Sequence, residues 1–187
     1  MELKKSKFME WKSEATLSQF VAWTLFCATD GETSYGKKLN EYSKEILFFL
    51  LFGKNYREKL NEYTVKKVDV VRESETLDII AEIVLEKGSE EHKFALFLEL
   101  KLYTNTSENQ LDKYKKVAER KYKEDSFEKK FVLLVVWKDE VPQEERILCE
   151  RFGFTPYTFV NVLETVFDSK PANSENPLFD EFWTGYW

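Results

Sequence analysis

A glutamate and a lysine stand two residues apart in the segment Glu99-Leu100-Lys101. The apolar run 94–98 precedes it and predicts a buried β-strand. Because side chains alternate between the two faces of a strand, Glu99 and Lys101 point to the same side. A carboxylate and an ammonium group at the end of a buried strand are costly unless something pairs with them. A divalent cation and a phosphate group would do so.

A second acid, Asp78, is a candidate for the same site. Asp78 lies in the run 77–85, which predicts a strand paired with the one at 94–98. On that strand Asp78 shares a face with Ile80 and Glu82, so its carboxylate and that of Glu99 could converge on one ion. Two carboxylates and a backbone carbonyl suit Mg²⁺, which prefers oxygen ligands and keeps several waters.

These residues must be positioned by an alternation of helices and strands. Apolar periodicity, capping residues and turn signals predict the following order: helices 13–30, 39–52 and 56–63, strands 65–72, 77–85 and from 94, a helix from 107, strand 131–137, helix 142–152, strand 154–159 and helix 161–167. The first three strands predict an antiparallel meander. Strand 131–137 is a continuous apolar run after a helix, which indicates a crossover. The tail from Ser169 is expected to be loop-like, with its aromatic residues holding it to the core.

Composition excludes several kinds of chemistry. The single histidine, His92, leaves no basis for HExxH zinc hydrolysis, and a Ser-His-Asp or Cys-His mechanism would have to use this one residue. The two cysteines, Cys27 and Cys149, predict buried thiols in a reducing cytoplasm. The apolar runs are too short to cross a bilayer, so we expect a cytoplasmic protein without membrane contact. A formal net charge of −6 argues against polycation-like binding of nucleic acid but permits a local basic groove.

The order of elements and motifs resembles the PD-(D/E)XK nuclease superfamily. Asp78 matches the first acid, Glu99-Leu100-Lys101 the (D/E)XK part, and the run 110–114 the QxxxY motif of several branches. Glu14 is similar to the first-helix acid of those branches. The resemblance implies an α/β fold with a mixed central β-sheet flanked by helices: a restriction-endonuclease-like α-β-β-β-α-β core, about 13–137, within a single domain 1–187. The extension 138–187 would add C-terminal helices.

The same resemblance implies a metal-dependent nuclease that hydrolyses phosphodiester bonds, most simply in DNA. Asp78, Glu99 and the carbonyl of Leu100 would hold Mg²⁺, for which Mn²⁺ substitutes. Lys101 would act on the attacking water, with Gln110 and Glu14 completing the catalytic set. Cutting both strands with one site per chain would favour a homodimer. Glu73 and Glu75 are further candidate acids.

The helix that carries the QxxxY motif also predicts a nucleic-acid contact. Its stretch 110–123 has six basic residues against two acidic ones, a net charge of +4. Lys113, Lys116 and Arg120, together with Tyr114, are the expected contacts with nucleic acid. Lys4, Lys5 and Lys7 are possible additions at the N-terminus.

Structural alternatives remain open for each of these residues. Glu99 and Lys101 could form an ordinary ion pair, and Gln110 could complete a capping box with Ser107. Tyr114 could belong to the core, and Glu14 could serve only the dipole of its helix. The basic stretch could be a solvated helix face. For the whole protein, the acidic net charge and Leu77 before the first acid leave open an inactive binding or regulatory module of the same fold. An RNA-directed nuclease is a further alternative.

Overall fold

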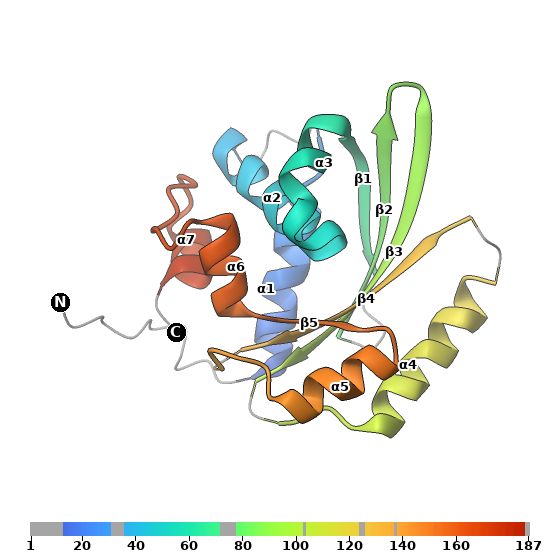
Figure 1. Ribbon diagram of the computed structural model, residues 1–187. Helices are drawn as coiled ribbons and strands as arrows, with labels where there is room; N and C mark the ends of the chain where they lie inside the picture. The colour runs from blue at the N-terminus through green and yellow to red at the C-terminus, as the bar shows by residue number, and fades with distance from the viewer. Residues whose placement is uncertain are drawn as a thin grey trace.

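A computed structural model describes residues 13–30, 36–71, 78–102, 104–123, 126–136 and 138–185. Glu73, Glu75 and the three N-terminal lysines lie outside these ranges. The centre of the molecule is a mixed sheet with strand order β1-β2-β3-β4-β5 (Figure 1). Its strands are β1 (Thr64–Val71), β2 (Ile79–Lys87), β3 (Glu90–Lys101), β4 (Glu128–Val135) and β5 (Thr155–Thr158).

Strand pairing follows the predicted topology. β1, β2 and β3 form an antiparallel meander, and Gly88, with φ of 64°, lies in the turn between β2 and β3. β4 runs parallel to β3, with Lys101 opposite Val135, and β5 runs parallel to β4. The crossover from β3 to β4 contains the helix that follows the Glu99-Leu100-Lys101 segment. The predicted meander, crossover and mixed sheet are therefore confirmed.

Helices begin where the sequence offers capping side chains. Ser13 accepts the backbone N–H of Thr16, and Ser107 accepts that of Gln110. The helices are α1 (Glu14–Phe26), α2 (Lys37–Phe52), α3 (Tyr56–Glu62), α4 (Glu108–Lys121), α5 (Gln143–Arg151), α6 (Phe159–Val166) and α7 (Pro177–Thr184), with a single 3₁₀ turn, η3 (Gly53–Asn55), between α2 and α3.

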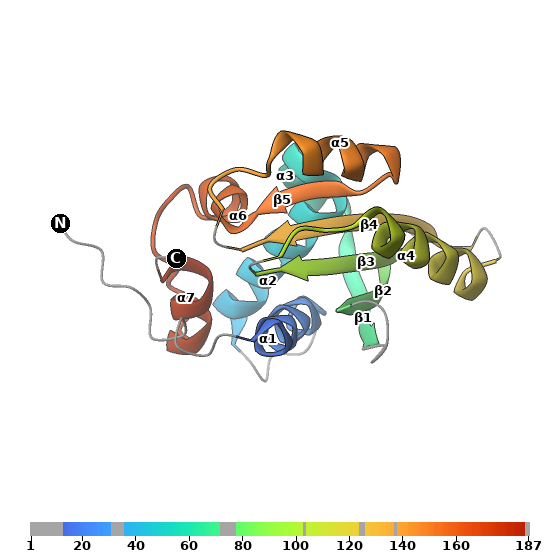
Figure 2. The same cartoon turned by 90° about the horizontal axis from the view of Figure 1, so that it is seen from below.

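Each face of the sheet is covered by its own set of helices (Figures 1 and 2). α1, α2, α6 and α7 pack on the face that carries Leu96, Leu98 and Leu100. α4 and α5 pack on the opposite face, against Ala95 and Phe97. The alternation expected along β3 is thus confirmed, and it places the side chains of Glu99 and Lys101 on the side of α4.

The C-terminal tail differs from the expectation of a loop. Pro177 to Thr184 form α7, because the Asn176 side chain accepts the N–H groups of Leu178 and Phe179 and Pro177 fits the first helical position. Phe179, Phe182 and Trp183 are fully buried against the core, at the spacing of one helix face. The aromatic residues hold the tail as predicted, but they do so from a helix.

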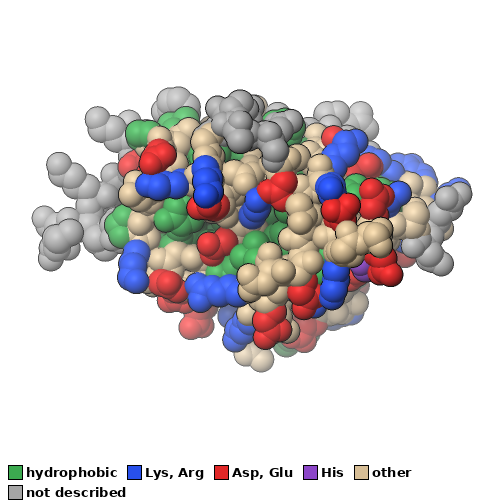
Figure 3. Space-filling view, turned by 90° about the horizontal axis from the view of Figure 1, so that it is seen from above, with side chains coloured by type: hydrophobic (Ala, Val, Ile, Leu, Met, Phe, Trp, Pro, Cys, Tyr) green, Lys and Arg blue, Asp and Glu red, His purple; other side chains and the backbone are tan. Residues whose placement is uncertain are grey.

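Charged side chains of both signs lie on the surface, and the two thiols lie inside the protein. At the end of the molecule seen from above, Lys and Arg side chains are interspersed with Asp and Glu among the coloured residues (Figure 3). In the part of the chain that the structure describes, no helix combines the length and apolar character needed to cross a bilayer. Cys27 and Cys149 are both buried thiols, as predicted.

Candidate active site

The carboxylate of Glu99 and the ammonium group of Lys101 lie together at the C-terminal end of β3. Glu99 Oε1 and Lys101 Nζ are 2.6 Å apart, and the two residues are only 3% and 6% exposed. A buried ion pair is weak evidence for stability, because desolvation of both charges offsets their attraction. Buried ionisable groups at the end of a strand are more typical of functional sites.

Gln110 connects this pair to α4. Its Nε2 donates to Glu99 Oε1 across 2.6 Å and also contacts the hydroxyl of Tyr114. The Gln110 side chain therefore points into the site, and the capping-box alternative, in which it would reach back to Ser107, is not what the structure contains. Only the backbone N–H of Gln110 takes part in the cap.

Tyr114 lies inside the protein and not on the basic face of α4. Its side chain is 3% exposed within the core under α4. Burial raises the pKa of its hydroxyl, and the negative charge of Glu99 raises it further. The burial contradicts the expected direct contact between Tyr114 and nucleic acid, since its ring has almost no surface to offer. Its place next to Gln110 and Glu99 instead makes it part of the carboxylate site.

Asp78, the residue just before β2, lies at the same end of β3. Its Oδ2 accepts the backbone N–H of Leu100 across 2.8 Å. In a strand, the N–H and the C=O of one residue point to the same edge of that strand. The Leu100 carbonyl therefore points to the same edge of β3 as the Leu100 N–H, which Asp78 accepts. Asp78 and the Leu100 carbonyl thus lie at one edge of β3, where β2 has not yet begun its pairing at Ile79 opposite Leu98.

The acids are close enough to influence each other electrostatically. Burial raises the pKa of Glu99 to about 7, and the negative charge of Asp78 acts in the same direction, while the Lys101 ammonium group opposes both. Two carboxylates that repel each other in a desolvated place are the setting that a bound cation relieves. Among the described residues no group of three or more His, Cys, Asp or Glu could hold a metal. A metal here would therefore depend on Asp78, Glu99 and backbone or solvent oxygens.

Glu14 joins the site through the backbone and not through the two acids. From the first turn of α1, its Oε1 accepts the N–H of Leu102 across 3.1 Å. Asp78 and Glu14 therefore hold Leu100 and Leu102, the residues on either side of Lys101. The contact shows that Glu14 does more than favour the dipole of its own helix.

The basic residues of α4 divide into two groups. Lys113, Lys116 and Arg120 are exposed on one face of the helix. Lys116 pairs with Asp112 at 2.6 Å, whereas Lys113 and Arg120 have no acidic partner among the residues that the structure describes. Lys115 is different, because its Nζ lies 4.0 Å from the centre of the Phe131 ring. Within the described ranges, two cations of this exposed face thus have no acidic partner.

Two residues have contacts that the sequence did not predict. Glu82 accepts a hydrogen bond from the Tyr122 hydroxyl across 2.6 Å. Glu145 on α5 is buried, and its Oε1 accepts the N–H of Thr106 across 2.9 Å. In the sequence Glu145 was only an acid in the first turn of a helix, and no local pattern could show that it reaches a loop 39 residues earlier.

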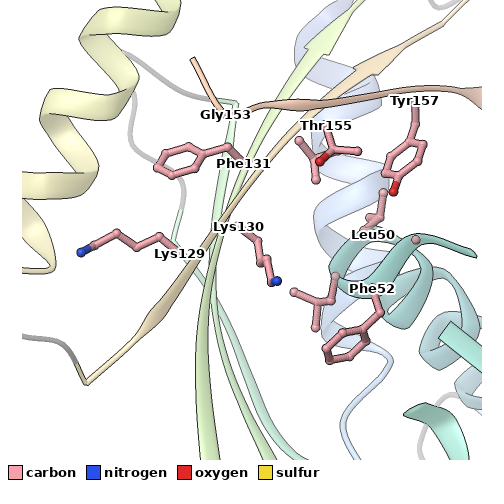
Figure 4. Close-up of a pocket in the computed structure, with 11 residues that line it drawn as sticks. Leu50, Phe52, Lys129, Lys130, Phe131, Gly153, Thr155 and Tyr157 are labelled. Atoms are coloured by element: carbon pink, nitrogen blue, oxygen red, sulfur yellow. The ribbon is translucent and has the colours of Figure 1, made fainter. Parts of the chain in front are cut away.

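A cavity of about 450 Å³ lies elsewhere, on the α2 side of the sheet (Figure 4). It is bordered by the end of α2, the first half of β4 and the start of β5, and Lys130 and Tyr157 point into it (Figure 4). Asp78, Glu99 and Lys101 do not line it. We therefore place the candidate active site at the end of β3 and not in this cavity.

The fold is that of an α/β protein with a mixed sheet flanked by helices, and two acids and a lysine lie at the end of its third strand. A family model of the PD-(D/E)XK nuclease superfamily matches residues 7–169, and the chain belongs to this superfamily. No curated protein matches the chain. Membership supports a nuclease-like function, and nucleases of this superfamily generally use divalent metals.

Proposed function

We propose that the protein is a Mg²⁺-dependent endonuclease that hydrolyses phosphodiester bonds in DNA. The observation that carries this proposal is the buried contact of Glu99 with both Lys101 and Gln110, beside Asp78. A merely structural ion pair does not need a second carboxylate that raises the pKa of the first.

The donor set fits a hard divalent cation. Asp78, Glu99 and the Leu100 carbonyl would hold Mg²⁺, with Mn²⁺ as a substitute, because all three offer oxygen ligands. When bound, the metal would lower the pKa of a coordinated water and offset charge on the phosphate.

The chain's own residues have separate tasks in this proposal. Lys101 orients or deprotonates the attacking water and offsets negative charge that develops on the phosphate. Gln110 holds the Glu99 carboxylate in place, while Asp78 and Glu14 fix the backbone on both sides of Lys101. Lys113, Lys116 and Arg120 follow the phosphate backbone along the exposed face of α4.

Cleavage of supercoiled plasmid DNA with Mg²⁺ or Mn²⁺ tests this proposal. We expect wild-type protein to nick or degrade the plasmid, and Asp78→Asn and Lys101→Met to reduce the rate by roughly 10²-fold or more. Lys93→Ala, an exposed lysine on β3, is the matched control and should cleave like wild type. Equal rates for wild type, Asp78→Asn and Lys101→Met would contradict the assignment of these residues.

Two further measurements separate the proposal from its alternatives. Calorimetric titration with Mn²⁺ should show binding that Asp78→Asn weakens, whereas an inactive module of this fold should show no carboxylate-dependent binding. RNA incubated under the same conditions should be cut more slowly than DNA. Sedimentation of the protein with and without DNA tests whether a homodimer forms, which paired cuts in both strands would favour.

A further inference from the structure

The connection from β3 to α4 determines whether Gln110 meets Glu99. This connection begins after Lys101, at Leu102, and ends at Ser107, which caps α4. Gln110 is the third residue of α4, so a displacement at the start of the helix moves its Nε2 away from Glu99 Oε1. A contact of 2.6 Å tolerates little displacement.

The connection is held at its far end by a buried carboxylate. Glu145 Oε1 accepts the N–H of Thr106, the residue immediately before the Ser107 cap. Glu145 is 6% exposed and Thr106 is 8% exposed, so water competes little with this bond. At the near end of the connection, Glu14 holds Leu102 in the same way.

Lys138 supports this arrangement from the segment that follows β4. Its Nζ donates to Asn105 Oδ1 across 2.9 Å and lies 3.7 Å from Glu145 Oε2. Glu145 Oε2 and Thr106 Oγ1 are both buried without a hydrogen-bond partner among the described residues. Burial of a carboxylate whose second oxygen has, in the described part of the chain, only the ion pair with Lys138 and no hydrogen bond is costly. Such a group is expected where its other oxygen has a specific function.

We infer that Glu145 is a positioning residue for the proposed reaction: by holding Thr106 it sets the start of α4 and thereby the contact of Gln110 with Glu99. The inference rests on the proposed nuclease function. Glu145 does not touch the reacting atoms, and it acts through the backbone of a loop. Replacement of residues that hydrogen-bond metal ligands typically lowers activity about 10–100-fold, and Gln110, whose position Glu145 sets, is such a residue here.

Three variants on α5 test the role of Glu145. Glu145→Ala should lower kcat about tenfold or more with KM for DNA changed less than twofold, because the basic face of α4 remains exposed. Glu145→Gln keeps an oxygen that can accept the Thr106 N–H, so it should recover most of the lost kcat. Glu144→Ala removes an exposed acid from the preceding position and should behave like wild type.

Hydrogen exchange gives a readout that does not depend on cleavage. In Glu145→Ala the midpoint of urea unfolding should fall, because the Thr106 N–H loses its charged acceptor. Amides of the peptide 104–110 should exchange faster by a larger factor than those of β2. A wild-type kcat, or unchanged protection of the Thr106 amide in a folded Glu145→Ala protein, would overturn the role of Glu145. Wild-type protein that cleaves no nucleic acid would instead overturn the proposed function itself.

Discussion

Gln110 Nε2 lies 2.6 Å from Glu99 Oε1, and this contact joins α4 to the end of β3. The same amide nitrogen contacts the Tyr114 hydroxyl, so one side chain fixes both a carboxylate and a phenol. Hydrogen bonds to a charged acceptor are stronger than those between neutral groups, which makes the orientation of Glu99 depend on Gln110.

Replacement of Gln110 should therefore impair the site without unfolding the protein. In Gln110→Ala the carboxylate of Glu99 loses a donor, and we expect a rate of DNA cleavage about 10–100-fold lower. Plasmid cleavage measures the rate, and circular dichroism verifies the fold. Asn109→Ala, at the exposed neighbouring position, is the control. Full activity of Gln110→Ala would show that its contact with Glu99 is only structural.

The basic face of α4 should govern affinity for DNA more than the rate of cleavage. Lys113→Ala combined with Arg120→Ala removes two exposed cations without an acidic partner in the described part of the chain. Each lost phosphate contact should flatten the dependence of log K on log salt concentration by about 0.9. Fluorescence anisotropy with the inactive Lys101→Met protein measures this slope. An unchanged slope, equal to that of a Lys93→Ala control, would remove this face from the binding site.

Glu14 should contribute to stability as well as to the site. Glu14→Ala leaves the Leu102 N–H without its charged acceptor, and such bonds contribute about 1.5–3 kcal/mol. We expect the free energy of unfolding in urea to fall by an amount near the lower end of this range, since the bond is only partly buried. The free energy of unfolding of Glu14→Gln should fall less, because the side-chain oxygen of Gln can still accept the Leu102 N–H. Glu58→Ala, an exposed acid in the first turn of α3, should have little effect.

A buried hydrogen bond between Trp183 Nε1 and Thr24 Oγ1, 2.9 Å long, fastens α7 to α1. Trp183→Phe leaves the Thr24 hydroxyl without this donor in the core and should lower the free energy of unfolding by about 1–3 kcal/mol. The double variant Trp183→Phe with Thr24→Val should lose less than the sum of the two single losses. Urea unfolding followed by circular dichroism measures all three, and strict additivity would exclude a coupling between these side chains.

The two thiols should be unreactive in the folded protein. Cys27 and Cys149 are buried, and burial raises the pKa of the Cys149 thiol to about 12. At pH 8 the folded protein should therefore react slowly with Ellman's reagent, because the thiolate is the nucleophile. Both thiols should react rapidly in 6 M guanidinium chloride, a condition that serves as the control. Rapid reaction of both thiols without denaturant would show that the core on both faces of the sheet opens readily.

Local sequence patterns determined the elements and the faces on which residues lie. Alternation along β3 predicted that Glu99 and Lys101 share a face, and Ser13 and Ser107 predicted the starts of α1 and α4. These features depend on neighbours within a few residues, which a sequence displays directly. The missed helix α7 is the exception, because its short apolar stripe had to compete with Pro177 and the loop-like residues before it.

Only the tertiary structure decided which side chains meet at the end of β3. From the sequence, the Gln110 side chain could complete the cap of α4 or belong to the candidate site. The packing of α4 on the sheet places it against Glu99. The contacts of Glu14 with Leu102 and of Glu145 with Thr106 join residues 88 and 39 positions apart. Such contacts form where a strand end or a loop leaves backbone N–H groups without a partner, and long-range folding determines which acids reach them.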